Sequence, residues 1–475
     1  MPEKCHFDFR DLSRLTLLRS CPVSALLMIL TLLLSACATY QDRPIQLDDI
    51  GRNFESRSLD NAELQKYIAT NLRRDVNPWP PQQWNLTLLT LAAYYYNPEL
   101  DVARAKWSVA AAAVKTAGQR PNPALQLPFG YTVDAKNGDT PWTYGINLDI
   151  PIETAGKRGY RIAQAQQLSL AARLDIGNVA WQVRSRLRGN LLNLYAASRK
   201  ASLLEKVVSA QEDIVDMLDN RLSHGAASAA EISQARITLS QDRRDLALAE
   251  MQMRDARARV ASAIGLPASA LSDIKISFDV FEQEYFDVPA DEVRYKAMLG
   301  RPDLLSALAK YEASQAALQL EIAKQYPDIH LGPGYLYNRD GDSLVLPVSF
   351  VALPLFNRNE GPIAEAEAKR DEAAAQVKAL QARAINDTEQ ALQNYYAAAG
   401  NLAASDLLLS AQENQLKALQ NTFDTGETDR LTVTQAQRAF YSNKLIGQDP
   451  LIRVQQAIGQ LEDALQRPLV IPADE

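Results

Sequence analysis

Apolar residues alternate with polar or small residues in four segments of the chain, at about residues 124–134, 142–150, 328–337 and 344–353. A period of two is typical of β-strands with one apolar face, because successive side chains point to opposite sides. The apolar sides are Leu125, Leu127, Phe129, Tyr131 and Val133; Tyr144, Ile146, Leu148 and Ile150; Ile329, Leu331, Tyr335 and Tyr337; and Leu344, Leu346, Val348 and Phe350. The opposite sides carry Thr132, Thr143, Asn147, Asp149 and Ser349. The Gly-, Asn- and Asp-rich stretches AKNGDTP and NRDGDS predict turns near 135–140 and 338–343.

A second pattern, with apolar residues three and four positions apart, predicts long helices. One runs without proline from Lys157 to Leu222, and a helix of similar length runs from Gly361 to Phe423. At 1.5 Å per residue, roughly 65 residues extend close to 100 Å, which a globular core does not need. Shorter helices at 98–117 and 302–325 precede the strand pairs. Gly225 and Gly426 then reverse the chain into another long helix each time, because glycine adopts positive φ without penalty.

These elements occur in the same order twice. The sequence NPEL at Asn97–Leu100 matches RPDL at Arg301–Leu304, 204 positions later, and the offset falls only to 201 further along. Other matched pairs in the ordered series are Pro123 and Pro327, Gly130 and Gly334, Pro151 and Pro354, Tyr195 and Tyr396, Gly225 and Gly426, Gln234 and Gln435, and Pro267 and Pro468. Such a series indicates an internal duplication.

Strands of about ten residues with one apolar side and aromatic residues near their ends are typical of transmembrane β-barrels. Four strands cannot close a barrel, since closure takes about eight or more. Two alternatives follow: either the strands form an ordinary small sheet between helices, or several chains share one barrel.

The N-terminus has the features of a bacterial export signal. Three arginines precede an apolar run from Val23 to Leu34, which is too short to span a bilayer and ends in LSAC at Cys37. This ending resembles a lipobox, in which Cys37 is acylated and becomes the first residue of the mature chain; a plain signal peptide is the alternative. No apolar window of about 18 residues follows residue 40, which argues against a membrane-spanning helix.

Composition excludes several classes of function. The net charge of −7 argues against a nucleic-acid partner, and all three cysteines lie within the first 37 residues, so a mature chain that begins at Cys37 has no thiol pair. Of the histidines only His224 and His330 follow the signal, and we expect neither to be a specific metal ligand, because metal sites usually take three or four converging ligands. No phosphate loop or catalytic motif is present, so we expect no cofactor, no metal site and no enzyme activity.

Together the duplication, strand pairs, long helices, glycine turns and lipobox resemble the TolC-like outer-membrane efflux proteins, from about Leu86 to Pro468. The stretch PLFNRNEGPIAEAEAKRDEAAAQ, Pro354–Gln376, is most similar to the heavy-metal cation efflux branch. The resemblance implies a mainly α fold with a small β part: a trimeric tunnel in which three chains give four strands each to a twelve-stranded outer-membrane barrel, continued by a long periplasmic α-helical barrel. It implies a signal peptide at 1–36, an N-terminal periplasmic segment at 37–85, a first repeat at 86–270, a linker at 271–295 and a second repeat at 296–470.

The resemblance also assigns roles to the two glycine turns, at the periplasmic mouth. The residues expected to dock an adaptor are Arg221, Ser223, Gly225, Ser228, Thr425, Gly426 and Thr428. The gate candidates are Phe423, Asp424, Glu427, Asp429, Thr432 and Gln435. Family gates typically use aspartates a turn or two beyond the second glycine, where this chain has Thr432 and Gln435; nearby Asp424, Glu427 and Asp429 could supply the negative charge.

The function that follows is a passive exit duct of a tripartite RND-type efflux system in a Gram-negative outer membrane, with heavy-metal cations as cargo. Its expected partners are two further copies of the chain, a periplasmic adaptor (membrane fusion) protein, an inner-membrane RND transporter that supplies the energy, and outer-membrane lipid. A multidrug or type I secretion duct is one alternative. A periplasmic coiled-coil scaffold or adaptor without a pore is another, although such a protein would lack duplicated strand pairs.

Overall fold

The computed structural model describes residues 40–134, 140–282, 300–338, 341–345, 348–349 and 355–469. Cys37, residues 135–139 of the first predicted turn and residues 339–340 of the second lie outside these residues. The chain divides into two units, and the boundary in the sequence falls between Phe54 and Glu55. The first unit contains nearly all of α2 (Leu47–Glu55), whose Leu47, Ile50 and Phe54 lie on one exposed apolar face. All further elements belong to the second unit.

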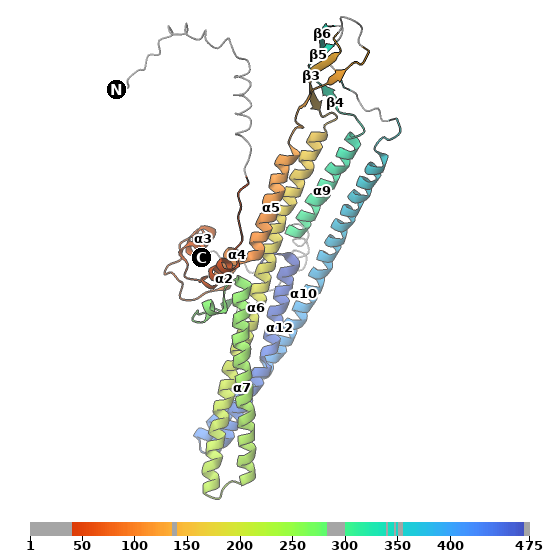
Figure 1. The fold of residues 1–475 in the computed structure, drawn as a ribbon. Coiled ribbons are helices and arrows are strands. Elements are labelled where there is room, and N and C mark those ends of the chain that lie inside the picture. Colours follow the sequence, from red (N-terminus) through yellow and green to blue (C-terminus); the bar gives the residue numbers. More distant parts are fainter. Residues whose placement is uncertain are drawn as a thin grey trace, which may run out of the picture. The chain divides into compact units, whose positions relative to one another are not determined.

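Four helices form the body of the second unit (Figure 1): α5 (Pro98–Ala117), α6 (Lys157–Ser223), α9 (Pro302–Ala323) and α10 (Glu360–Asp424). α6 packs between α5 and α9, and α9 packs against α10. The long helices α6 and α10 have 67 and 65 residues, close to the lengths that the sequence predicts. Small residues such as Ala171 and Gly177 of α6 and Ser306 of α9 allow these two helices to approach closely. The Ser306 hydroxyl donates to the Ala171 carbonyl at 3.3 Å.

The return helices differ between the two repeats. α7 (Ala229–Ile264) runs back along α6 without a break. The second return was predicted as one long helix, and this was wrong: it is divided at Gly447 into α11 (Arg430–Ile446) and α12 (Gln448–Leu465). Pro450 lies in the first turn of α12, where its missing N–H costs nothing, but it cannot continue α11, because its ring would meet the carbonyl four residues earlier.

The strands form one antiparallel sheet (Figure 1). β1 (Ala124–Gln126) and β2 (Phe129–Tyr131) pair with the two halves of β3 (Trp142–Ile152), whose other side pairs with β4 (Ile329–Leu331) and β5 (Gly334–Asn338). β6 (Gly341–Val345) pairs with β5, and β7 (Val348–Ser349) pairs with β4. Pro128 and Pro333 interrupt the first and third predicted strands, because proline cannot donate to the ladder.

One predicted turn is shorter than expected. Gly341 pairs with Asn338, so the strands continue into the segment predicted as a turn at 338–343.

One face of the sheet is apolar and exposed, as the alternation predicts. The register sets Phe129 opposite Tyr144, Tyr131 opposite Trp142, and Ile146 opposite Tyr335. Phe129, Tyr131, Tyr144 and Ile146 are exposed by 73%, 57%, 48% and 48%. Their aromatic rings contact each other across strands, with ring centroids 4.7 Å apart for Tyr131 and Trp142. An exposed apolar face of this kind is typical of a surface that contacts a membrane or another protein.

A compact core surrounds the middle of α6. Side chains from α3 (Ala62–Leu72), α4 (Leu86–Tyr96), α7 and the 3-10 turns η2 (Ala268–Leu271) and η3 (Asp279–Phe281) pack on it. The fully buried members include Ile68, Leu89, Leu187, Leu191, Ile264 and Phe281. A smaller core joins α10 to α12 through Leu392, Tyr395, Val454 and Leu461.

Buried charged side chains fix α12 against α6. The Glu462 carboxylate accepts from Arg184 Nη1 at 2.9 Å and lies 3.3 Å from Arg188 Nε. Next to it, Asp463 accepts from Trp181 Nε1 at 2.9 Å and from the Ser185 hydroxyl at 2.7 Å. Burial raises the pKa of the Asp463 carboxyl above its ordinary value, and these two hydrogen bonds do not fully offset it.

Candidate functional site

The two glycine turns have the same hydrogen-bonded construction. Gly225 has φ of 74° and Gly426 has φ of 83°, the left-handed region that the sequence predicts for both. In the first turn the Ala226 N–H donates to the Arg221 carbonyl at 2.7 Å. In the second turn the Glu427 N–H donates to the Thr422 carbonyl at 2.9 Å. Each bond satisfies a carbonyl that the end of the helix would otherwise leave free.

The residue three positions after each glycine caps the return helix. Ser228 forms a capping box with Glu231, whose carboxylate accepts from the Ser228 N–H at 2.7 Å. That backbone hydrogen bond is the main reason that the pKa of Glu231 lies below its ordinary value. Asp429 caps α11 in the same way and accepts from the Thr432 N–H at 2.8 Å. The gate candidate Asp429 is thus also a helix cap.

An ion pair joins the two turns. Arg221 Nη2 lies 2.5 Å from Asp429 Oδ2, and both side chains are partly exposed. The hydrogen bonds from Thr432 and then from Arg221 lower the pKa of Asp429 to about 2. The structure therefore brings together one predicted docking residue and one predicted gate residue, which sequence analysis did not connect.

Among the other predicted residues, Thr432 contacts this pair as a donor to Asp429, and the rest lie in the same two turns and the helix ends beside them. Phe423, Asp424, Glu427, Thr432 and Gln435 are exposed, and neither Asp424 nor Glu427 forms an ion pair with any residue that the structure describes. The Ser223 and Thr425 hydroxyls donate to carbonyls of their own helices, at 2.7 and 3.1 Å. Thr428, which precedes the helix cap Asp429 in the sequence, is half-buried.

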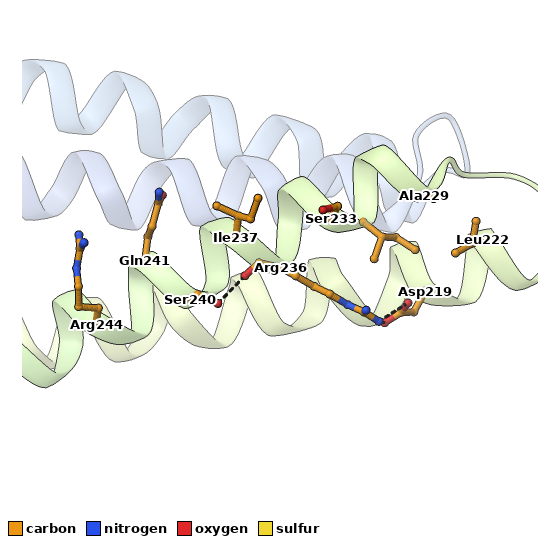
Figure 2. Close-up of a pocket in the computed structure, with 10 residues that line it drawn as sticks. Asp219, Leu222, Ala229, Ser233, Arg236, Ile237, Ser240, Gln241 and Arg244 are labelled. Carbon is orange, nitrogen blue, oxygen red and sulfur yellow. Dashed lines mark hydrogen bonds and ion pairs between the residues drawn. The ribbon is translucent and has the colours of Figure 1, made fainter.

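An open groove with a volume of about 620 Å³ lies beside the first turn and is lined mainly by α7. Figure 2 shows the side chains that line it. Arg236 crosses to α6 and donates to both carboxylate oxygens of Asp219, at 3.0 and 2.9 Å. The apolar side chains of Leu222 and Ile237 line the same groove and are 39% and 51% exposed. The groove combines apolar surface with fixed charge.

Further ion pairs hold the hairpins together above the turns. Arg243 of α7 contacts Glu212 of α6 at 2.7 Å, and Arg438 of α11 contacts Asp242 of α7 at 2.8 Å. Sequence analysis missed these residues. Glu212 and Arg243, like Asp219 and Arg236, lie at equal distances in the sequence from a point between Ala227 and Ser228, and this shared centre is the signal that could have identified them.

Neither histidine belongs to a group of three or more metal-ligand side chains within the described segments. His224 Nδ1 lies 2.8 Å from the Asn220 carbonyl. His330 Nδ1 lies 2.9 Å from Asp149 Oδ1. Likewise, no helix in the described segments has the length and apolar character needed to cross a membrane.

A family model described as "Outer membrane efflux protein" matches residues 92–266 and again residues 293–467. The chain belongs to the outer membrane efflux protein family. This confirms the predicted family, and because the family consists of transport channels, the chain is not an enzyme.

Two curated relatives show the range of cargo in related proteins. The cobalt-zinc-cadmium resistance protein CzcC of Cupriavidus metallidurans is 22% identical over 330 residues, which cover 68% of this chain and 76% of CzcC. The pyoverdine export outer membrane protein OpmQ of Pseudomonas aeruginosa is 24% identical over 338 residues, covering 66% of this chain and 68% of OpmQ.

Solved structures share the fold. The outer membrane protein VceC from Vibrio cholerae superposes with a TM-score of 0.64 at 18% identity, over 81% of this chain and 97% of VceC. CusC, whose structures were described in connection with transmembrane channel formation, gives a TM-score of 0.63 at 16% identity, over 90% of this chain and 99% of CusC. The predicted fold class, mainly α with a small β part, is confirmed.

Proposed function

We propose that this outer-membrane efflux channel is the passive exit duct of a tripartite RND-type system, formed by three copies of the chain. The observation that carries the proposal is the sheet. One of its faces is apolar and exposed, and in the part of the chain that the structure describes β1 and β2 pair only with β3. Each sheet has four strands when β1 with β2, β4 with β5, and β6 with β7 are each counted as one interrupted strand beside β3. Three such sheets joined edge to edge would give a closed twelve-stranded barrel with its apolar face toward lipid.

The helix order supports the same assembly. α5 and α7 each pack against α6, whereas α10 packs against α9, α11 and α12, which in turn contact α6. The outer surface of α10 is mostly exposed along its length, including Leu407 and Leu408 at 75% and 60%. Joining α10 of one copy to α5 and α7 of the next would bury this surface and continue the tunnel with C₃ symmetry.

The glycine turns would then form six tips around the periplasmic mouth. A periplasmic adaptor docks there, with Arg221, Ser223 and Ser228 of the first turn and Thr425 and Thr428 of the second at the contact. The ion pair between Arg221 and Asp429 holds the two tips of one chain together, so a change at this pair accompanies opening. An inner-membrane RND transporter supplies the energy.

The cargo proposed is divalent heavy-metal cations. This rests on the likeness to CzcC, a cobalt-zinc-cadmium resistance protein, and on the branch resemblance of residues 354–376. OpmQ, a pyoverdine export protein, is equally similar, so export of an organic molecule is the competing function. The two functions are separated by deleting the gene and measuring both tolerance to cobalt, zinc and cadmium and siderophore export. Loss of metal tolerance alone supports export of metal cations. Loss of siderophore export alone refutes it.

The transmembrane placement is tested by labelling. Cysteines introduced at Asn137 and Asp340, which the sequence predicts to lie in turns between strands, are expected to react with an impermeant maleimide on intact cells. A cysteine at Asp424, in the second turn, is the matched control and should react only after the outer membrane is permeabilised. Protection of both Asn137 and Asp340 on intact cells would favour a periplasmic scaffold without a pore. Heat-modifiable migration of the trimer on a gel tests the assembly separately.

We also propose that Cys37 carries the lipid anchor. The motif LSAC follows an apolar run of suitable length, and dual acyl chains attach a protein stably to a membrane. Labelled palmitate should enter the natural chain and not Cys37→Ala. Equal labelling of both would show that the signal peptide is of the plain type.

A further inference from the structure

A histidine and an aspartate form a pair on the face of the sheet opposite the exposed apolar residues. Asp149 of β3 and His330 of β4 lie on the face that also carries Thr143 and Asn147. On both sides of His330, Ile329 and Leu331 point to the apolar face and are 37% and 36% exposed. In a barrel with its apolar face toward lipid, the pair therefore faces the lumen.

The hydrogen bond fixes how the imidazole is protonated. His330 Nδ1 lies 2.9 Å from Asp149 Oδ1 and 3.2 Å from Oδ2. An ionised carboxylate can only accept, so the hydrogen must be on Nδ1, and in the neutral ring the Nε2 lone pair is left as an acceptor. Among the described residues, none donates to Nε2. The side chain of His330 is 37% exposed, so Nε2 is not shut away from solvent.

This is the arrangement in which proteins present histidine to a metal ion. Ligating histidines almost always donate their other ring N–H to a carboxylate or carbonyl, which fixes the tautomer and raises the basicity of the ligating nitrogen. His224 differs in its place and its partners: it lies beside the first glycine turn and not on the polar face of the sheet, and its Nδ1 contacts the Asn220 carbonyl and the Ser223 hydroxyl.

We propose that His330, oriented by Asp149, is a weak and exchangeable contact for divalent transition-metal cations in the lumen of the channel. The proposal rests on the proposed function, because it requires that the polar face line a pore. One imidazole with water as the remaining ligands binds loosely, and a conducting pathway needs contacts that are weak enough to release the ion. Imidazole favours zinc and cobalt over magnesium, which prefers carboxylate and water oxygens. The trimer carries three such contacts, one for each chain.

The test uses the purified full-length trimer in a planar bilayer, with potassium current as the readout. Zinc chloride or magnesium chloride is added on the side of the strand connections. Half-block by zinc is expected to need about tenfold more zinc in His330→Gln, because glutamine retains an N–H donor for Asp149 but lacks the ring nitrogen. Asp149→Asn, at the positioning residue, is expected to weaken zinc block by about tenfold as well. His224→Gln is the matched control and should block like the natural chain, and magnesium should block no variant.

Two results would overturn the proposal while leaving the channel intact: equal zinc block of the natural trimer and His330→Gln, or loss of block in His224→Gln, which would place the contact at the tips. Absence of any current through the natural trimer would instead refute the proposed pore, and the lumen contact with it. Normal heat-modifiable migration of His330→Gln and Asp149→Asn shows that the variants are assembled and that a change in block reflects the contact itself.

Discussion

Arg221 at the end of α6 donates to Asp429 at the start of α11 over 2.5 Å, and this contact joins the turns of the two repeats. The two residues are 208 positions apart in the sequence. Asp429 has two roles at once, since it also caps α11 through the Thr432 N–H. A substitution at Asp429 that is meant to test the ion pair must therefore leave the helix cap intact.

Loss of the ion pair alone is expected to loosen the tips. Asp429→Asn retains a good helix cap, and Arg221→Gln leaves the cap untouched, yet each removes the charge attraction. A partly exposed pair contributes about 0.2–1 kcal/mol, so the open population should rise by at most about fivefold. Single-channel conductance of the trimer measures this, with Asp424→Asn as the control. If the two variants change the free energy of opening by amounts that simply add in the double variant, the two residues act separately.

The same pair predicts a step in conductance at low pH. The folded-state pKa of Asp429 is about 2, below its ordinary 3.8, so its contribution to the closed tips is complete above about pH 4 and is lost as the pH falls from 3.8 toward 2. The natural trimer should therefore conduct equally at pH 5 and pH 8 and approach Asp429→Asn near pH 2. A step of the same size in Asp429→Asn would assign the effect to another group.

The glycine turns predict a purely conformational cost for substitution. A Cβ at Gly225 or Gly426 would have nothing within 4 Å beyond its chain neighbours, so positive φ alone opposes a side chain. Gly225→Val and Gly426→Val should each cost about 1 kcal/mol or more, and the matched Asn variants less, because Asn adopts this conformation more readily. Adaptor cross-linking and metal tolerance should fall at unchanged surface amounts of trimer. Normal cross-linking and export by both Val variants would show that the turns are only connections.

Local signals predicted much of the fold. Period-two alternation located the strands, the long helical pattern located α6 and α10 to within two residues, and the offset near 201 aligned the two turns. Prolines limited the precision: Pro128 and Pro333 divide predicted strands, and Pro450 with Gly447 divides the second return helix. Each is a local backbone effect that the periodicity of side chains does not report.

The candidate site was predicted less completely, because its contacts join distant segments. The turns themselves followed from glycine, and the equivalence of Ser228 and Asp429 at the offset of 201 could have identified both as helix caps. The pairing of Arg221 with Asp429 depends on how α6 packs against α11, which no local pattern specifies. The pairing of Asp149 with His330 likewise depends on the register of β3 and β4.

The buried charges between α6 and α12 predict a large loss of stability on removing one partner. Glu462 is 4% exposed and faces both Arg184 and Arg188. Glu462→Ala should lower the free energy of unfolding by about 3–5 kcal/mol, because two buried guanidinium groups would lose the carboxylate that contacts them both. Denaturant titration of the solubilised protein, followed by helical circular dichroism, measures the change.

A matched replacement separates the ion pairs from simple packing. Replacing Arg184, Arg188 and Glu462 together by Met, Leu and Leu removes the charges but keeps much of the volume, and such changes are often neutral or stabilising. The triple variant should therefore recover most of the stability that Glu462→Ala loses. Glu462 also accepts a hydrogen bond from the Leu469 N–H at 3.1 Å. If the triple variant is as unstable as Glu462→Ala, either packing or this hydrogen bond contributes more to stability than the ion pairs do. A loss below about 1 kcal/mol in Glu462→Ala would instead mean that water reaches the arginines and that the network does not hold α12 in place.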